Sequence, residues 1–214
     1  MSGYMKAAAL LSGMLLMFST GCGLCDAVEK PVVEPPAPAK APPEYVEPPP
    51  APAPLPPAVT KSIEDLSEKY PGLFKLDKDK GLLVFNADVT FDSGSAAVKP
   101  EARDALGKLA KILSEDEVKD RRLTVIGHTD TDRVVKPATI ETLKRLGKSV
   151  DNMGLSEARA EAVATVLQAG GIDATRMTTR GKGEAEPVAE NRTPEGKARN
   201  RRVEIYLTPA KPAS

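Results

Sequence analysis

The chain of 214 residues has no tryptophan, one histidine and two cysteines, and aromatic residues make up 4% of it. With so few aromatic side chains, the core must be built from leucine, valine, isoleucine and alanine. A single histidine with no cysteine cluster beside it argues against a zinc site, and we expect neither a metal nor a cofactor. The formal net charge is zero, so no overall field favours nucleic acid, and no nucleic acid partner is expected.

Apolar segments long enough to span a membrane are also missing from the N-terminal region. An apolar run from Ala7 to Phe18 follows Lys6. This run has the length of the hydrophobic region of a signal peptide and is too short to cross a bilayer. Small residues at positions 19–21 then precede Cys22. We therefore expect residues 1–21 to be a signal peptide.

The residues around Cys22 resemble a bacterial lipoprotein lipobox, although Ser19 stands where that family usually has leucine. The resemblance implies lipidation of Cys22. Because Gly23 follows instead of aspartate, it also implies anchoring at the periplasmic face of the cell outer membrane, where multiple lipid chains give a stable anchor. Cys22 and Cys25 also have the C-x-x-C spacing of redox pairs, an alternative that requires a strand before the motif and a helix after it.

Most of the 20 prolines lie before residue 58, in a segment of proline, alanine, valine and glutamate. Such a composition cannot form a core. We expect residues 22–60 to be the lipidated N-terminus and a semi-rigid polyproline II spacer, whose proline-rich part would extend roughly 80 Å. A proline-rich ligand for a partner domain is the alternative. A short helical lead-in is expected at residues 61–80, the globular domain at 81–208 and a tail at 209–214.

Hydrophobic periodicity divides the globular part into short elements. Strands are expected at residues 82–85, 89–91, 122–126, 177–180 and 203–207. Helices are expected at residues 63–70, from Pro100, at 139–146 and from Leu155 to Gly170. This order indicates an α+β fold, a β-α-β-α-β-β sandwich in which helices pack on one face of a mixed β-sheet.

Five ordered motifs carry a family resemblance. They are Phe91-Asp92-Ser93-Gly94-Ser95, Gly127-His128-Thr129-Asp130, Asn152-x-x-Leu155-Ser156-x-x-Arg159-Ala160, Gly181-x-Gly183-Glu184-x-x-Pro187 and Asn200-Arg201-Arg202-Val203-Glu204-Ile205. Residues 82–208 thus resemble the OmpA-like C-terminal domain, a family that includes the peptidoglycan-associated lipoproteins. The resemblance implies non-covalent binding of peptidoglycan through the diaminopimelate of the stem peptide, with no catalysis. Residues 133–151 look inserted relative to the common spacing in that family.

The candidate site pairs an acid just past a strand end with a base on a later helix. Ligands bind in such crevices of α/β sheets. We expect Asp130 to hold the ammonium and Arg159 the carboxylate at the free end of diaminopimelate. If Ser156 is the N-cap, Arg159 lies in the first turn, where a cation opposes the helix dipole unless an anion binds there. The structural alternatives are Asp130 capping its own turn and Arg159 folded back onto Glu157 or another surface acid.

Four further residues complete the predicted ligand-binding set. The backbone N–H groups of Ser93 and Gly94 are expected to donate to the ligand carboxylate, and Asn152 opens the motif that contains Arg159. Arg202 belongs to the segment Asn200-Arg201-Arg202, which either reaches carboxylates of the ligand or fixes the last strand to the sheet.

The sequence therefore predicts an outer-membrane lipoprotein that binds peptidoglycan and tethers the envelope layers. Other envelope proteins are further candidate partners. One alternative is a stator-type cell-wall anchor of a motor, which needs a membrane helix with an intramembrane acid. Another is a cell-wall hydrolase that uses His128, Asp130 and Asp132 as an acid/base cluster.

Overall fold

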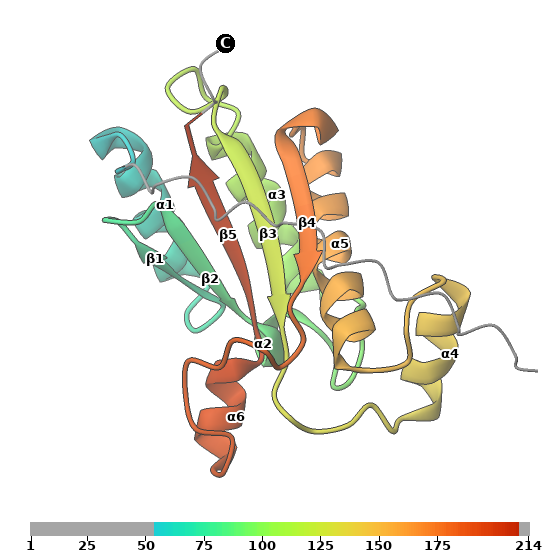
Figure 1. Cartoon of the computed structure of the whole chain (residues 1–214). Coiled ribbons are helices and arrows are strands. Elements are labelled where there is room, and N and C mark those ends of the chain that lie inside the picture. Colours follow the sequence, from blue (N-terminus) through green and yellow to red (C-terminus); the bar gives the residue numbers. More distant parts are fainter. Residues whose placement is uncertain (1–53, 210–214) are drawn as a thin grey trace, which may run out of the picture. The chain divides into compact units, whose positions relative to one another are not determined.

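The computed structural model describes residues 54–209, in which five strands form one mixed sheet (Figure 1). The signal peptide, Cys22 and most of the predicted spacer lie outside the described residues. Within residues 54–209 no helix is both long enough and apolar enough to cross a membrane.

Most of the strands contain β-branched or aromatic residues, which favour extended backbone. They are β1 (Phe74–Asp77), β2 (Leu82–Asn86), β3 (Arg122–His128), β4 (Met177–Gly181) and β5 (Arg202–Thr208), in the sheet order β1-β2-β5-β3-β4. All neighbouring pairs are antiparallel except β3 and β4, which are parallel. This arrangement confirms the predicted α+β fold with a mixed sheet.

Proline supplies the first residue of four helices, where its missing N–H group has no intrahelical partner to lose. These four are α1 (Pro57–Lys69), α3 (Pro100–Ile112), α4 (Pro137–Arg145) and α6 (Pro194–Asn200). The others are α2 (Ala87–Thr90), α5 (Asn152–Ala169) and the 3₁₀ turn η1 (Ala174–Arg176). The helix predicted in the inserted segment is thus present as α4.

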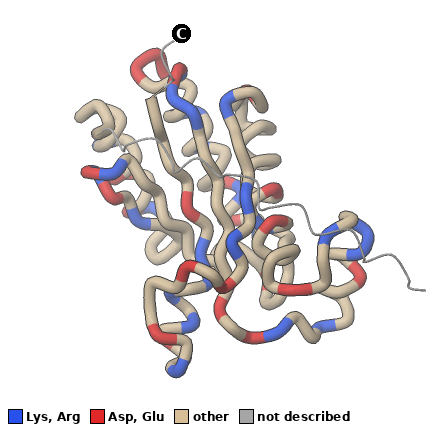
Figure 2. Tube along the Cα trace, in the orientation of Figure 1, with Lys and Arg blue, Asp and Glu red and all other residues tan. Residues whose placement is uncertain are grey.

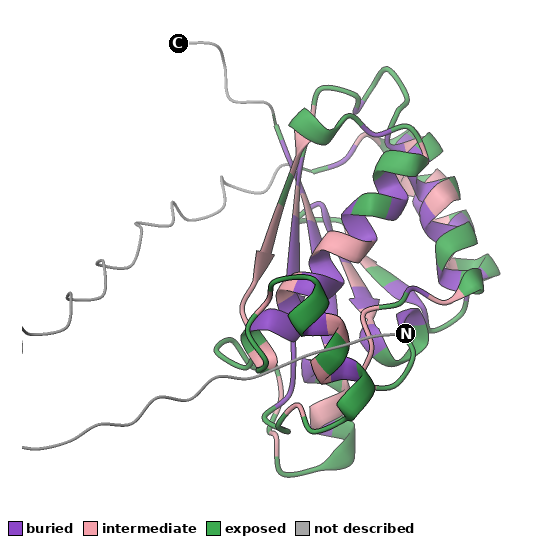
Figure 3. Cartoon of the chain, turned by 90° about the vertical axis from the view of Figure 1, so that its right-hand side faces the viewer, coloured by how far each residue is buried: buried purple, intermediate pink, exposed green. Residues whose placement is uncertain are grey.

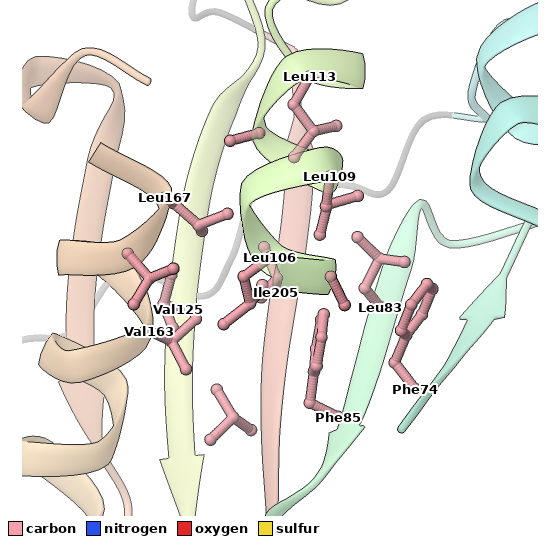
Figure 4. Close-up of a cluster of buried hydrophobic side chains, with 14 of the residues drawn as sticks. Phe74, Leu83, Phe85, Leu106, Leu109, Leu113, Val125, Val163, Leu167 and Ile205 are labelled. Carbon is pink, nitrogen blue, oxygen red and sulfur yellow. The ribbon is translucent and has the colours of Figure 1, made fainter. Parts of the chain in front are cut away.

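The core lies between the sheet and the helices that cover one of its faces, as the side view shows (Figure 3). From α3 and α5, aliphatic side chains point at the strands (Figure 4). The residues at the centre are fully buried: Leu83, Phe85, Leu106, Leu109, Leu167 and Ile205. Because each buried leucine contributes about 1.5–3 kcal/mol to the hydrophobic stabilisation, this layer holds the sheet and helices together.

The N-terminal boundary of the folded unit differs from the prediction. Helix α1 begins at Pro57, inside the segment expected to be spacer, and its Val59 and Ile63 are completely buried in the core. Strand β1 was not predicted. Its Phe74 stacks on Phe85, with ring centroids 4.9 Å apart, and so adds an edge strand to the sheet.

The prediction of a strand at residues 89–91 is wrong. Residues 87–90 form the short helix α2, because the Asn86 side chain accepts a hydrogen bond from the N–H of Asp88 and caps it. Phe91 then pairs with Val98 in an isolated bridge that closes the loop between them. That loop carries Ser93 and Gly94 to the end of the sheet where β3 terminates.

Candidate functional site

Helix α5 begins at Asn152, earlier than the sequence indicated, and the expected N-cap at Ser156 is wrong. Asp151 is the N-cap, and its side chain accepts the N–H of Gly154 at 2.8 Å. The hydroxyl of Ser156 lies inside the helix and accepts the N–H of Gly183 at 2.9 Å. Arg159 is therefore about two turns into the helix, where the field of the helix N-terminus no longer explains its position.

Two glycines let the first half of α5 rest directly on the ends of β3 and β4. A Cβ on Gly127 would lie 2.1 Å from the carbonyl oxygen of Ser156, and one on Gly181 would lie 2.5 Å from its hydroxyl. No other residue permits this approach. The contact fixes Arg159, on α5, relative to Asp130, which follows β3.

A cleft of about 520 Å³ opens at this end of the sheet. Five of the six predicted ligand-binding residues line it: Ser93, Gly94, Asp130, Asn152 and Arg159. Helix α2 and the loop after it, the loop after β3, helix α4 and helix α5 all contribute to its walls. The structure thus brings together segments that are far apart in the sequence.

Arg159 is a buried cation, with 4% of its surface exposed. Its Nε donates to the carbonyl oxygen of Ser95 at 3.0 Å, and the guanidinium lies 5.3 Å from the ring centroid of Phe91. Among the described residues, no carboxylate lies within 4.0 Å of it. Burial lowers the pKa of Arg159 to about 10, although Asp88 and Asp130 act in the opposite direction. The alternative contact with Glu157 is not formed.

Asp130 is also buried, and its partner is Arg201. The Oδ2 atom of Asp130 lies 2.5 Å from Nη1 of Arg201, and Oδ1 accepts the N–H of Asp132 at 3.1 Å. Arg201 also binds both carboxylate oxygens of Asp88, at 2.7 and 2.6 Å. These two acids raise the pKa of Arg201. Asp130 therefore caps its own turn and is held in place by Arg201, which the predicted ligand-binding set did not include.

The Ser93–Gly94 turn is held by the inserted segment. Lys136 Nζ donates to the hydroxyl of Ser93 at 2.7 Å and to its carbonyl oxygen at 3.0 Å. The hydroxyl of Thr139 donates to the carbonyl oxygen of Gly94, which has a φ of 70° that favours glycine. Within the described part of the chain, the N–H groups of Ser93 and Gly94 donate to no protein atom. They remain available to a ligand.

Asn152, the first residue of α5, connects two loops at the edge of the cleft. Its Nδ2 donates to the carbonyl oxygen of Asp130 at 3.1 Å and to Oε2 of Glu184 at 2.7 Å. This leaves its amide oxygen as a possible acceptor for a ligand.

The sixth predicted residue, Arg202, lies away from the cleft. Successive strand residues point to opposite faces of a sheet, so that Arg202 faces the side not covered by helices, where its Nε lies 2.7 Å from Oε1 of Glu204. His128 is on the same side, with Nε2 3.4 Å from Oε2 of Glu204. Burial raises the pKa of Glu204, but contacts with His128, Arg202 and Tyr206 outweigh it and hold this pKa at about 2.

The acid/base cluster imagined for a hydrolase is not assembled. His128 is 1% exposed and does not line the cleft, whereas Asp132 binds Lys197 at 2.6 Å. Within residues 54–209, no group of three or more histidine, cysteine or acidic side chains is placed to hold a metal ion.

Comparisons with known proteins identify the family and support the fold. A model of the OmpA family matches residues 90–201. The chain belongs to the OmpA family. The probable lipoprotein YiaD of Escherichia coli (strain K12) is 41% identical over 131 residues, which are 61% of this chain and 52% of that protein. Outer membrane protein A of Bordetella avium is 38% identical over 125 residues, 58% of this chain and 56% of that protein.

This OmpA-family chain thus spans about half the length of these curated relatives. Among solved structures, the cell wall anchor of the T6SS from Pseudomonas aeruginosa is similar, with a TM-score of 0.58 and 29% identity over 71% of this chain and 96% of that one. A putative MotB-like protein from Desulfovibrio vulgaris has a TM-score of 0.58 at 24% identity, covering 71% of this chain and 89% of that one, and shares the fold. The family predicted from the five motifs is confirmed.

Proposed function

We propose that this domain binds peptidoglycan without cleaving it, by holding the free end of a diaminopimelate residue in the cleft. The observation that carries this proposal is the buried Arg159, which has no carboxylate partner among the described residues. Burying a charge without a partner is costly. A ligand carboxylate supplies that partner, because the guanidinium fork can bind both of its oxygens.

The same cleft offers acceptors for the ammonium on the same carbon. A carboxylate has about four acceptor positions, and Asp130 uses only part of this capacity on Arg201 and on the N–H of Asp132. Arg201 thus orients Asp130, and the amide oxygen of Asn152 is a second acceptor. The unpartnered N–H groups of Ser93 and Gly94 add donors for the carboxylate.

Binding is favoured over hydrolysis because His128 lies outside the cleft, whereas Asp130 and Asp132 are paired with Arg201 and Lys197. The likeness to MotB-like proteins at 24% identity supports the fold, and no feature of residues 54–209 favours a motor component.

We further propose that the protein is a lipoprotein of the outer membrane that tethers it to the cell wall. In support, relatives carry the names probable lipoprotein and outer membrane protein A, and a similar structure is a cell wall anchor. The lipobox-like residues before Cys22 would supply the anchor. The folded domain would then meet peptidoglycan at the far end of the proline-rich segment.

Cosedimentation with purified sacculi tests the binding proposal. We expect the purified protein to sediment with sacculi and Arg159→Ala to stay in solution while keeping its circular dichroism spectrum. Lys144→Ala, which removes an exposed cation from α4 outside the cleft, is the matched control and should sediment like the wild type. Undiminished sedimentation of Arg159→Ala, or release of soluble fragments from the sacculi, would contradict the proposal.

A further inference from the structure

The inserted segment gives the cleft a wall that the family motifs do not contain. Residues 133–136 lead from the end of β3 into α4, and all four line the cleft. Figure 2 shows basic residues on this loop and on α4 itself. Of these, Arg133 and Lys136 line the cleft, and both are exposed.

The cleft has more unpaired basic residues than unpaired acids, and two of these basic residues belong to the insert. Arg201 forms ion pairs with Asp88 and Asp130, and Lys197 forms one with Asp132. The basic residues of the lining that have no carboxylate of the described residues within 4.0 Å are Lys99, Arg133, Lys136 and Arg159. Among the acids of the lining, Asp92 alone has no basic group of residues 54–209 within 4.0 Å. The cleft therefore has more free positive charge than one ligand carboxylate neutralises.

Lys136 and Thr139 also fix the position of this wall. Their bonds to Ser93 and Gly94 join the insert to the turn that faces Arg159. A Cβ on Gly94 would lie 2.8 Å from Cδ of Lys136, so that the lysine stem packs directly against the turn. Arg133 lies three residues before Lys136, and its guanidinium has no carboxylate of the described residues within 4.0 Å.

We infer that Arg133 and Lys136 form a second anion subsite, so that the cleft takes a ligand with two separate carboxylates. This inference rests on the proposed function: Arg159 binds the carboxylate at the free end of diaminopimelate, and the insert binds another carboxylate of the same stem peptide. Two carboxylates have the required chemistry, the α-carboxylate of the glutamate residue and the carboxylate of the terminal alanine. The insert would then select stem peptides by their state of amidation.

Calorimetric titration with a synthetic alanyl-glutamyl-diaminopimelyl-alanine peptide tests the subsite. Because Arg133 is exposed, we expect Arg133→Gln to weaken binding by about three- to fivefold. Arg145→Gln, which removes the same charge from an exposed position of α4 outside the cleft, is the control and should bind as the wild type does.

Amidated peptides identify the source of the second carboxylate. Amidating the group that contacts Arg133 should weaken wild-type binding by the same factor and leave Arg133→Gln unaffected, whereas amidating the other group should affect both proteins equally. If Arg133→Gln and Arg145→Gln bind every peptide alike while Arg159→Ala fails to bind, the subsite is refuted and the proposed function stands. If the wild type does not bind the peptide, both are refuted.

Discussion

Replacing Arg159 by methionine should remove ligand binding without destabilising the fold. Burial lowers the pKa of Arg159 from 12.5 to about 10, which corresponds to a destabilisation of roughly 3 kcal/mol in the charged form. A base whose folded-state pKa is lowered loses stability at every pH below that value, so the full destabilisation applies at pH 7.

Arg159→Met removes the charged group and with it this destabilisation. It also removes two favourable interactions of the guanidinium, which offsets the stability gained. The hydrogen bond to Ser95 contributes about 1.5–3 kcal/mol and the cation–π interaction with Phe91 about 0.5–1 kcal/mol. Methionine fills similar space, and its sulfur packs well against an aromatic ring. These contributions nearly cancel, so we expect the free energy of unfolding to change by no more than about 1 kcal/mol in either direction.

Arg176→Met is the control that should lose stability. Arg176 donates to three carbonyl oxygens, those of Leu113, Val118 and Arg121. Removing these hydrogen bonds should cost about 2–4 kcal/mol. Urea denaturation at pH 7, followed by circular dichroism, measures both variants. A decrease of more than about 2 kcal/mol in the free energy of unfolding of Arg159→Met would show that Arg159 stabilises the fold, and the case for a functional cation would fail.

Three further predictions concern other parts of the chain. The pKa of Glu204 is held at about 2, so its stabilisation of the fold is present above its ordinary pKa of 4.5 and disappears as the pH falls towards 2. In urea titrations at pH 5 and pH 2.5, Glu204→Gln should therefore reduce the loss of unfolding free energy between the two pH values by up to about 3 kcal/mol. Equal pH dependence of both proteins would contradict this. Replacing residues 134–150 by a glycine-serine linker should cost about 2 kcal/mol in the same assay, because buried Leu143 belongs to a small cluster separate from the main core; global unfolding would contradict it. Cys22→Ser should abolish incorporation of labelled palmitate in cells, and continued labelling would refute the lipid anchor.

Periodic patterns predicted the elements whose burial follows one face. The alternation around Val203 and Ile205 marked β5, and the spacing of Leu106 and Leu109 marked α3. Patterns failed where a side chain cap decides the structure. Asn86 turns the chain into α2 where β-forming residues suggested a strand, and Asp151 starts α5 before its apolar stripe begins.

Five of the six residues taken from the motifs line one cleft, but the local reasoning about their contacts was partly wrong. Asp130 and Arg159 do line one cleft, yet they do not pair, and Arg159 is not in the first helical turn. The predicted ligand-binding set contained Arg202 and not Arg201, although the alternation of β5 places Arg202 on the face opposite that of Val203 and Ile205. The contacts of Lys136 depend on how the insert folds over the Ser93 turn, which no spacing reveals.

The central claim is that Arg159 recognises the carboxylate at the free end of diaminopimelate. Lysine differs from diaminopimelate by lacking that carboxylate, so calorimetric titration with two stem peptides that differ only at this residue isolates the interaction. We predict that the wild type binds the diaminopimelate peptide at least about tenfold more tightly, since truncating one partner of a buried charge pair costs about 2–5 kcal/mol. Arg159→Ala should bind both peptides equally weakly. Equal affinity of the wild type for the two peptides would contradict the account.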